Sequence, residues 1–339
     1  MRKYWGRRLT PLQELQRFYA PSVRIRRREI LQILVVAGSA AWGCGAPSEQ
    51  SESHQPEADD PLSPAGPQVV PSDTTEEPVE AEPMGRTAFD LVPLGSTGIV
   101  TSRLAMGSGT TGYNGSSAQT RMGSEFADLL VAGYDRGIRF FETADAYGTH
   151  RIVGDAMQRV GRRNVTLLTK TMAETADEAA ADLDRFMEEL ATDYLDIVLL
   201  HIRTSENWVE ESAGAMEVLA QAKSQGRIRA HGVSCHSLAA LQLAAKTDWV
   251  DVDLARINPF GLHMDSDPGT VISLLEEMKN AGKAVLGMKI LGQGDAVDRF
   301  DQAIEHATRL DCLSAFTIGF RSLEELEGVS QKIASVTHG

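Results

Sequence analysis

The chain has 339 residues, of which 42% are hydrophobic, 24% charged and 6% aromatic, and its formal net charge is −14. This composition is typical of a globular protein, and no apolar run reaches the ~20 residues that a membrane-spanning helix needs. The negative charge argues against a nucleic-acid partner, and three cysteines with no Cys/His cluster at metal-ligand spacing indicate neither a disulfide framework nor a metal site.

The first 43 residues are basic, with a net charge of +7. Arg26-Arg27-Arg28-Glu29-Ile30-Leu31-Gln32 resembles a twin-arginine export signal, and the apolar stretch that follows, to Trp42, has the length of a signal-peptide core. The stretch ends in Ala41-Trp42-Gly43-Cys44, which resembles the site at which bacterial lipoproteins are cleaved and lipidated. We therefore expect an exported protein that a lipid on Cys44 anchors to a membrane. The alternative is a cytoplasmic protein whose start codon has been placed too early.

Residues 44–85 form a second region of different composition. They hold ten acidic residues, no Lys or Arg, and eight of the 13 prolines of the chain. Such a segment cannot bury enough apolar surface to offset its ordering entropy, so we expect a disordered, self-repelling tether. Directly after a lipidation site, a tether would hold a folded domain away from the membrane surface.

The remainder, residues 86–339, alternates short apolar strands with amphipathic helices. Apolar stripes at helical spacing run through 152–160, 183–190 and 271–278, and Ser322 to Glu325 read as a capping box that opens the last helix. Eight strand–helix units over this length predict a (β/α)₈ TIM barrel, with a doubly wound sheet as the alternative. The expected strands are Arg103–Met106, Arg139–Thr143, Val165–Lys170, Asp196–His201, Ile228–Ser234, Val252–Asn258, Ala284–Ile290 and Ala315–Gly319.

A glycine-rich run follows the first of these strands. Gly107-Ser108-Gly109-Thr110-Thr111-Gly112 matches GxGxxG, but the dinucleotide-binding interpretation requires a helix that begins inside the glycine loop. Here a turn-rich segment follows, and the next helical pattern begins only near Ser124. The run is therefore predicted to be a loop at the C-terminal end of the first barrel strand.

Three chemistry-bearing side chains stand at the ends of consecutive strands. In a barrel, the C-terminal ends of the strands converge on the active site, so Tyr147, Lys170 and His201 are expected to meet there. A tyrosine has an ordinary pKa of ~10, too high for an efficient acid near neutrality, and a lysine ammonium within reach favours its ionised form. A neutral histidine can orient a carbonyl oxygen. The three together form a proton-delivery set.

At this point the sequence resembles the aldo-keto reductase superfamily, over residues 89–339. The match rests on several motifs in the family's order: Leu94-Gly95-Ser96-Thr97-Gly98, Thr143-Ala144-Asp145-Ala146-Tyr147-Gly148, Thr169-Lys170, Asp193 to His201, Gly232-Val233-Ser234, Gly287-Met288-Lys289 and Ile318-Gly319-Phe320-Arg321. The resemblance implies a TIM barrel and an NAD(P)-dependent oxidoreductase that interconverts a small aldehyde or ketone and its alcohol.

The resemblance also implies catalytic roles. Tyr147 would be the general acid and base, Lys170 the group that lowers its pKa, and His201 the residue that orients the carbonyl. The family's fourth residue is an aspartate five positions before the tyrosine, and here that position is Glu142. We expect Glu142 to keep the salt bridge in an altered form, because the extra methylene moves the carboxylate.

Cofactor contacts follow from the same resemblance. Ser234 matches the serine that binds the nicotinamide carboxamide, and Met288 takes the place of the usual ring-stacking aromatic residue. Lys289, Gly319, Phe320 and Arg321 follow the last two strands, where barrels commonly bind phosphate. NADP(H) is favoured over NAD(H), although Gly319 replaces the basic residue that commonly holds the 2′-phosphate.

A second class of function stays open at this stage. A nucleotide-binding or scaffold lipoprotein, in which Glu142 has weakened catalysis, would share the fold and the N-terminal signal. The joint presence of Tyr147, Lys170 and His201 favours the enzyme, because a binding module needs none of them.

Overall fold

The computed structural model describes residues 86–336. The export-signal-like segment 1–43, Cys44 and the acidic segment 44–85 lie outside the described residues, so what the sequence predicts for them stays a prediction. Within the described part, none of the helices combines the length and the apolar character that crossing a bilayer requires.

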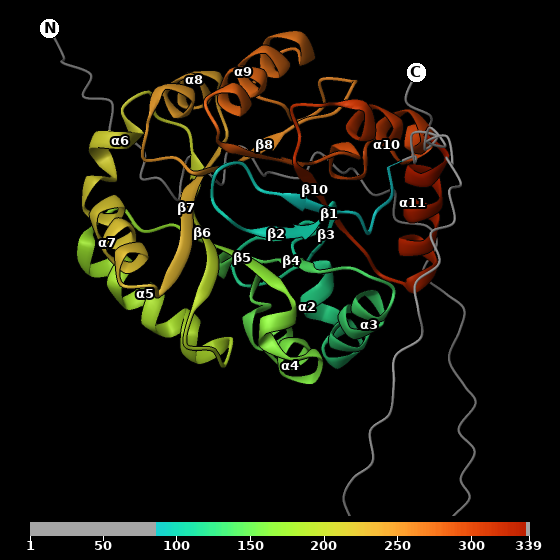
Figure 1. The fold of residues 1–339 in the computed structure, drawn as a ribbon, viewed down its shortest axis with the longest axis horizontal. Helices are drawn as coiled ribbons and strands as arrows, with labels where there is room; N and C mark the ends of the chain where they lie inside the picture. The colour runs from blue at the N-terminus through green and yellow to red at the C-terminus, as the bar shows by residue number, and fades with distance from the viewer. Residues whose placement is uncertain (1–85, 337–339) are drawn as a thin grey trace, which may run out of the picture. The chain divides into compact units, whose positions relative to one another are not determined.

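Eight parallel strands form a closed barrel in the order β10-β3-β4-β5-β6-β7-β8-β9, with helices around its outside (Figure 1). This arrangement confirms the (β/α)₈ prediction, and every expected strand overlaps a strand of the barrel. The strands are β3 (Leu104–Gly107), β4 (Phe140–Glu142), β5 (Thr166–Thr171), β6 (Leu195–Arg203), β7 (Ile228–Cys235), β8 (Val252–Arg256), β9 (Ala284–Met288) and β10 (Ala315–Gly319).

The helices carry the apolar stripes seen in the sequence. The stripes expected at 152–160, 183–190 and 271–278 lie on α4, α5 and α9. The helices are α2 (Ala118–Met122), α3 (Ser124–Asp135), α4 (His150–Val160), α5 (Ala176–Glu189), α6 (Trp208–Glu211), α7 (Ala213–Ser224), α8 (Leu238–Lys246), α9 (Pro268–Asn280), α10 (Phe300–Arg309) and α11 (Leu323–Ser335), with short 3₁₀ turns η1 (Asp145–Tyr147), η2 (Arg162–Asn164), η3 (Gly292–Gly294) and η4 (Val297–Arg299).

One helix was not expected from the sequence, and one expected cap differs from the structure. Helix α3 begins at Ser124, as the helical pattern predicts, but the short helix α2 precedes it at Ala118–Met122, capped by the Ser117 side chain through a reciprocal pair with Thr120. At α11, Ser322 accepts from the Glu325 amide as expected, but the Glu325 carboxylate accepts from the Arg321 amide at 2.8 Å. The capping box at this helix is therefore only half formed.

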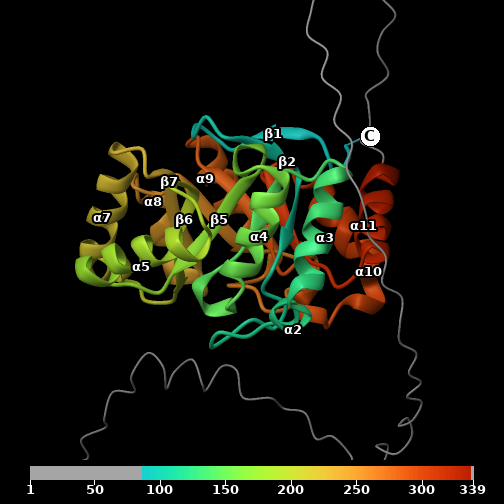
Figure 2. The ribbon, with the colours of Figure 1, turned by 90° about the horizontal axis from the view of Figure 1, so that it is seen from below.

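A hairpin closes the N-terminal end of the barrel. Its strands β1 (Leu91–Pro93) and β2 (Val100–Ser102) pair antiparallel, and Figure 2 shows them at the end of the barrel opposite α2. Val92, Leu94 and Ile99 are buried in one cluster with the side chains that fill the barrel interior. Ligands that reach the strand ends described below must therefore enter from the C-terminal side.

Candidate active site

Lys170 and Glu142 form an ion pair inside the C-terminal end of the barrel. Lys170, on β5, is fully buried, and its ammonium donates to Glu142 Oε1 on β4 and, at 2.9 Å, to the carbonyl oxygen of Thr143. Burial lowers the pKa of Lys170, and the charge and hydrogen bond of Glu142 oppose that shift. The altered salt bridge expected for Glu142 is present.

The second carboxylate oxygen of Glu142 also has a partner. Thr317, on β10, donates to Oε2 at 3.2 Å. Gly107 at the end of β3 leaves room for this contact, because a Cβ atom there would lie 2.9 Å from Oε2 and 2.7 Å from the threonine hydroxyl. A residue with a side chain at position 107 would displace the longer carboxylate.

Tyr147 meets Lys170 and His201 at the same end of the barrel. It ends the 3₁₀ turn η1, which begins three residues after the end of β4. The Lys170 Nζ atom lies 4.9 Å from the centre of the tyrosine ring, and the His201 ring lies edge-on to it with 5.7 Å between centroids. The structure thus brings together the three side chains that the sequence singled out.

The glycine-rich loop after β3 packs on the ring of Tyr147. A Cβ atom at Gly109 would collide with the ring, and one at Gly112 would lie 2.5 Å from its Cδ1 atom. Thr120, on α2, adds a 2.5 Å hydrogen bond to the Tyr147 carbonyl oxygen. The loop prediction for this GxGxxG run is confirmed, and the glycines allow close approach to a tyrosine.

His201 is held in its neutral form. It ends the inward-facing row of β6, where burial, followed by the charges of Lys170 and Lys289, holds its pKa well below the usual value. Among the described residues, its buried Nδ1 atom has no hydrogen-bond partner. An uncharged imidazole at this place can form a hydrogen bond with a ligand, either as donor or as acceptor, without itself becoming protonated.

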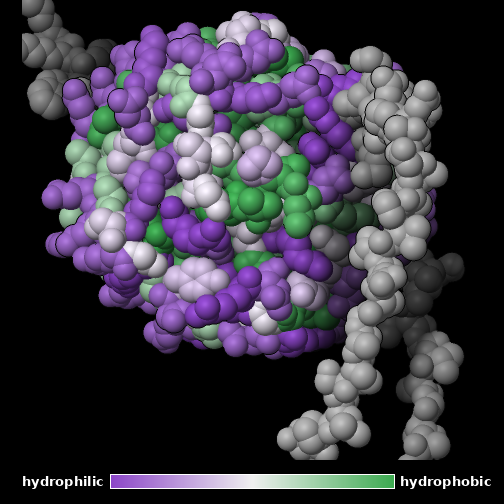
Figure 3. Space-filling model, in the orientation of Figure 1, coloured by the Kyte–Doolittle hydropathy of each residue, from purple (hydrophilic) through white to green (hydrophobic). Residues whose placement is uncertain are grey.

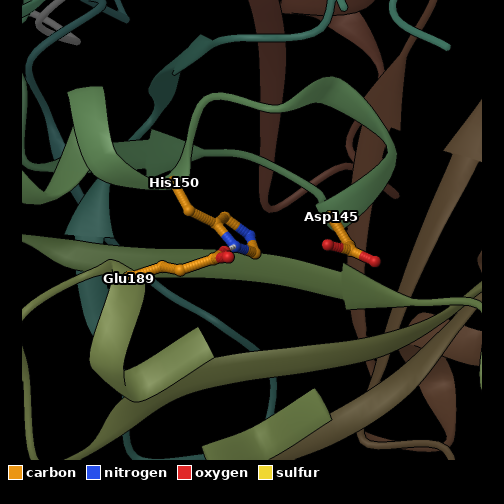
Figure 4. Close-up of side chains that lie close together, drawn as sticks. All are labelled: Asp145, His150 and Glu189. Atoms are coloured by element: carbon orange, nitrogen blue, oxygen red, sulfur yellow. Dashed lines mark hydrogen bonds and ion pairs between the residues drawn. The ribbon is translucent and has the colours of Figure 1, made fainter. Parts of the chain in front are cut away.

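Asp145, His150 and Glu189 form a cluster beside the turn that carries Tyr147 (Figure 4). One ring nitrogen of His150 is hydrogen-bonded to Glu189 at 2.9 Å, and the other is hydrogen-bonded to Thr169 at 2.8 Å. Asp145 accepts from Arg185 at 2.6 Å. Because each member already has a protein partner, we assign the cluster a structural role, in which Arg185 fixes the start of η1.

Three of the expected cofactor residues lie at the mouth of the barrel. Ser234 on β7 is buried and accepts from the Ile202 amide at 3.3 Å, and Met288 on β9 is 8% exposed. Lys289 follows in a left-handed conformation, with φ of 57°. Burial and the nearby charges of Arg256 and Lys170 lower the pKa of Lys289 to about 8. A cation in such surroundings is stabilised when an anionic ligand arrives.

The other three expected cofactor residues lie elsewhere along the same edge. Thr110 of the glycine-rich loop packs against Gly319. A Cβ atom at position 319 would collide with the Thr110 hydroxyl. Phe320 is buried, and its carbonyl oxygen accepts from Gln119 at 3.2 Å. The Arg321 side chain, just before α11, is 70% exposed and paired with Glu325 in the first turn of that helix. Arg321 therefore has to leave Glu325 before it can hold a phosphate.

One residue of the mouth was missed in the sequence. Arg256 continues the inward-facing row of Val252 and Leu254 on β8 and forms an ion pair with the buried carboxylate of Asp265. Strand alternation could have found it, since it lies two positions after a core leucine. Its partner lies on a loop, where no periodic pattern points to it.

The geometry agrees with a comparison against known families. A model described as the aldo/keto reductase family matches residues 105–330. The chain belongs to this family. Similar relatives include the aldo-keto reductase YhdN of Bacillus subtilis, 33% identical over 167 residues (44% of this chain and 48% of YhdN), and the methylglyoxal reductase YeaE of Escherichia coli, 36% identical over 143 residues (41% and 48%). The matched segments thus span about half the length of these relatives.

Solved aldo-keto reductases share the barrel. A crystal structure of an aldo-keto reductase from Pseudomonas aeruginosa superimposes with a TM-score of 0.62 and 24% identity, covering 74% of this chain and 96% of that one. At this level of identity the likeness establishes the fold, and function has to be argued from the site.

Proposed function

We propose that this aldo/keto reductase family member is an NAD(P)-dependent oxidoreductase that interconverts a small aldehyde or ketone and its alcohol. The observation that carries the proposal is the meeting of Tyr147 with the buried Lys170–Glu142 pair and a neutral His201 at one end of the barrel. A binding module gains nothing from burying an ion pair under a tyrosine ring, because desolvating two charges is costly.

The side chains divide the work as follows. Tyr147 donates its phenolic proton to the carbonyl oxygen, and the Lys170 ammonium stabilises the negative charge left on the ring. Glu142 keeps that ammonium charged and fixed. His201, neutral because of its depressed pKa, orients the carbonyl oxygen by hydrogen bonding. In the reverse direction Tyr147 accepts the alcohol proton.

The residues at the mouth fit a nicotinamide cofactor, which supplies or takes up the hydride when bound. The enclosed Lys289, with cationic neighbours and a depressed pKa, suits an anionic group. Ser234 would hold the carboxamide, Met288 would offer an apolar face to the ring, and Arg321 with the start of α11 would hold phosphate. We propose NADP(H) as the preferred form, with Phe320 and Gly319 contributing backbone contacts in place of a basic side chain.

The proposal is tested with the full chain and both cofactors. We expect NADPH oxidation in the presence of small aldehydes or ketones, methylglyoxal among them, with a lower KM for NADPH than for NADH. Tyr147→Phe should lower kcat by about 10²–10⁴-fold and leave NADPH affinity unchanged, because it removes one proton donor and little volume. Wild-type turnover in this variant would disprove the assigned role. NADPH binding with no turnover of any carbonyl would favour the scaffold lipoprotein.

We further propose that the protein is exported and held at a membrane through Cys44. The support is the sequence alone, namely the twin arginines at Arg27 and Arg28, the apolar core and the cysteine that follows it. Cell fractionation should find a detergent-released form that begins at Cys44, and Cys44→Ala should release the protein from the membrane. An uncleaved protein in the cytoplasmic fraction would disprove export.

A further inference from the structure

A cavity of about 250 Å³ lies at the N-terminal end of the barrel, opposite the catalytic side chains. Its walls come from the starts of β4 to β7 and from the β1–β2 hairpin, and at ~30 Å³ per molecule it has room for about eight waters. This face of a (β/α)₈ barrel ordinarily serves stability, so the proposed reaction makes no use of the cavity.

The cavity wall carries a guanidinium that no group within the described residues neutralises. Arg163, in η2, is exposed, and within residues 86–336 its side chain has no hydrogen-bond or ion-pair partner. The acidic lining residue, Asp196, is already saturated. Its Oδ1 accepts from Arg229 at 2.8 Å, and its Oδ2 accepts from Arg162 at 2.7 Å and from the Leu167 amide at 3.0 Å. Both carboxylate oxygens of Asp196 are therefore already occupied by other donors, and neither pairs with Arg163.

A further arginine adds to the positive charge of this wall. The guanidinium of Arg139 lies 4.0 Å from the centre of the Tyr134 ring and donates to the carbonyl oxygens of Tyr134 and Ile138, both at 2.7 Å. None of these partners is a carboxylate. The wall thus holds an excess of cations in a protein whose residues from 86 onward carry a net charge of −11.

The opposite wall is apolar and exposed. Leu91 and Val100 are 65% and 57% exposed, and they lie on the same outward face of the hairpin. Figure 3 shows apolar side chains at the centre of this face of the molecule, with hydrophilic ones around them. Leu91 and Val100 thus offer an apolar surface beside the charged wall, on which a short hydrocarbon chain could lie.

We propose that this cavity binds a small organic anion, a carboxylate or phosphate ester on a short apolar chain. The acidic group pairs with the guanidinium of Arg163, Arg229 adds positive charge beside it while it stays bound to Asp196, and the chain lies on Leu91 and Val100. The site is separate from the catalytic end and does not rest on the proposed reaction.

The test is calorimetric titration of the full chain with butyl phosphate. We expect saturable binding that weakens with salt, tighter binding than for inorganic phosphate, and no binding of butanol. Arg163→Ala should weaken binding about tenfold or more, because a charge-assisted hydrogen bond is lost. Because Arg163 is exposed and makes no hydrogen bond or ion pair within residues 86–336, its removal should not unfold the protein. Leu91→Ser should remove the preference for butyl phosphate over inorganic phosphate.

The matched control is Arg151→Ala. Arg151 is an exposed arginine on the first turn of α4, outside the cavity, and its removal should leave the titration unchanged. Equal binding by wild type and Arg163→Ala, or equal loss in Arg151→Ala, would overturn the proposal. Arg163-dependent binding to phosphatidylglycerol vesicles without binding of butyl phosphate would also overturn it, because the site would then recognise a lipid headgroup at a surface.

Discussion

The hydroxyl of Thr317 donates a 3.2 Å hydrogen bond to Oε2 of Glu142, across the end of β3 that separates their strands. Lys170 takes the other oxygen of the same carboxylate. Glu142 is one methylene longer than the aspartate expected by resemblance to the family, and Gly107 provides the space that this length needs. The substitution is therefore accommodated by two further residues rather than left as a defect.

Glu142→Asp should lower kcat about 10- to 100-fold with little change in KM. The shorter carboxylate cannot reach both Lys170 and Thr317, so the ammonium under Tyr147 loses its fixed position. The measurement is steady-state kinetics over a pH series, in which the acidic and basic limbs should also move. Identical rates and pH profiles would place Glu142 outside the catalytic network.

Thr317→Val supplies the matched comparison. It should give a smaller loss in the same direction, and the double variant with Glu142→Asp should lose no more than Glu142→Asp alone, because the hydrogen bond is already gone. Additive losses would show that Thr317 acts on its own and not through the carboxylate.

Gly109→Ala should lower kcat by about 10²-fold while NADPH affinity stays near that of the wild type. A Cβ atom at this position collides with the Tyr147 ring, and a displaced proton donor loses its geometry. Stopped-flow measurement of a single turnover checks the chemical step. Gly328→Ala, on α11, is the control, because no atom lies within 4 Å of its added Cβ. An unchanged rate in Gly109→Ala would show that the loop and the tyrosine move apart freely.

NADPH affinity should fall as the pH rises above about 8. The pKa of Lys289 is lowered to about 8, and a bound anion raises it, so binding takes up a proton once the free lysine is neutral. Below that pH the lysine is charged in both states and affinity is full. Fluorescence titration from pH 7 to pH 9.5 measures the effect. Lys289→Met should bind weakly at every pH and lose the dependence, whereas Lys279→Met should behave as the wild type.

Asp253→Asn should stabilise the protein near neutral pH. Asp253 is fully buried, both of its oxygens lack partners within the described residues, and burial followed by the charge of Asp265 raises its pKa from 3.8 to about 8. The unfolded chain gives up this proton above pH 3.8 while the native state keeps it, so stability falls as pH rises toward 8.

The expected gain for Asp253→Asn is roughly 2–4 kcal/mol in the free energy of unfolding at pH 8 and close to none at pH 4. Urea denaturation at the two pH values measures it. Asp193→Asn, at an exposed site, should change neither value. A variant with the same pH dependence as the wild type would show that Asp253 is ionised in the native state.

The eight strands and the meeting of Tyr147 with Lys170 and His201 could be predicted because both depend on local pattern. Strand ends of a parallel barrel share one edge, so position along each strand fixes which side chains converge. The contact between Thr317 and Glu142 could not be predicted, since it joins residues 175 positions apart and depends on how the strands are staggered. The close approach of Gly109 to the Tyr147 ring could not be predicted either, because it depends on the path of a loop that has no periodic sequence pattern.

Closure of the barrel has a consequence for the order in which the protein is made. The last strand, β10, pairs with the first, β3, over Phe316 to Gly319. A growing chain that already contains Tyr147, Lys170 and His201 still lacks Thr317, so the carboxylate of Glu142 has a partner on one side only. We therefore expect the arrangement around Glu142 to be complete only after β10 has been synthesised and has inserted between β9 and β3.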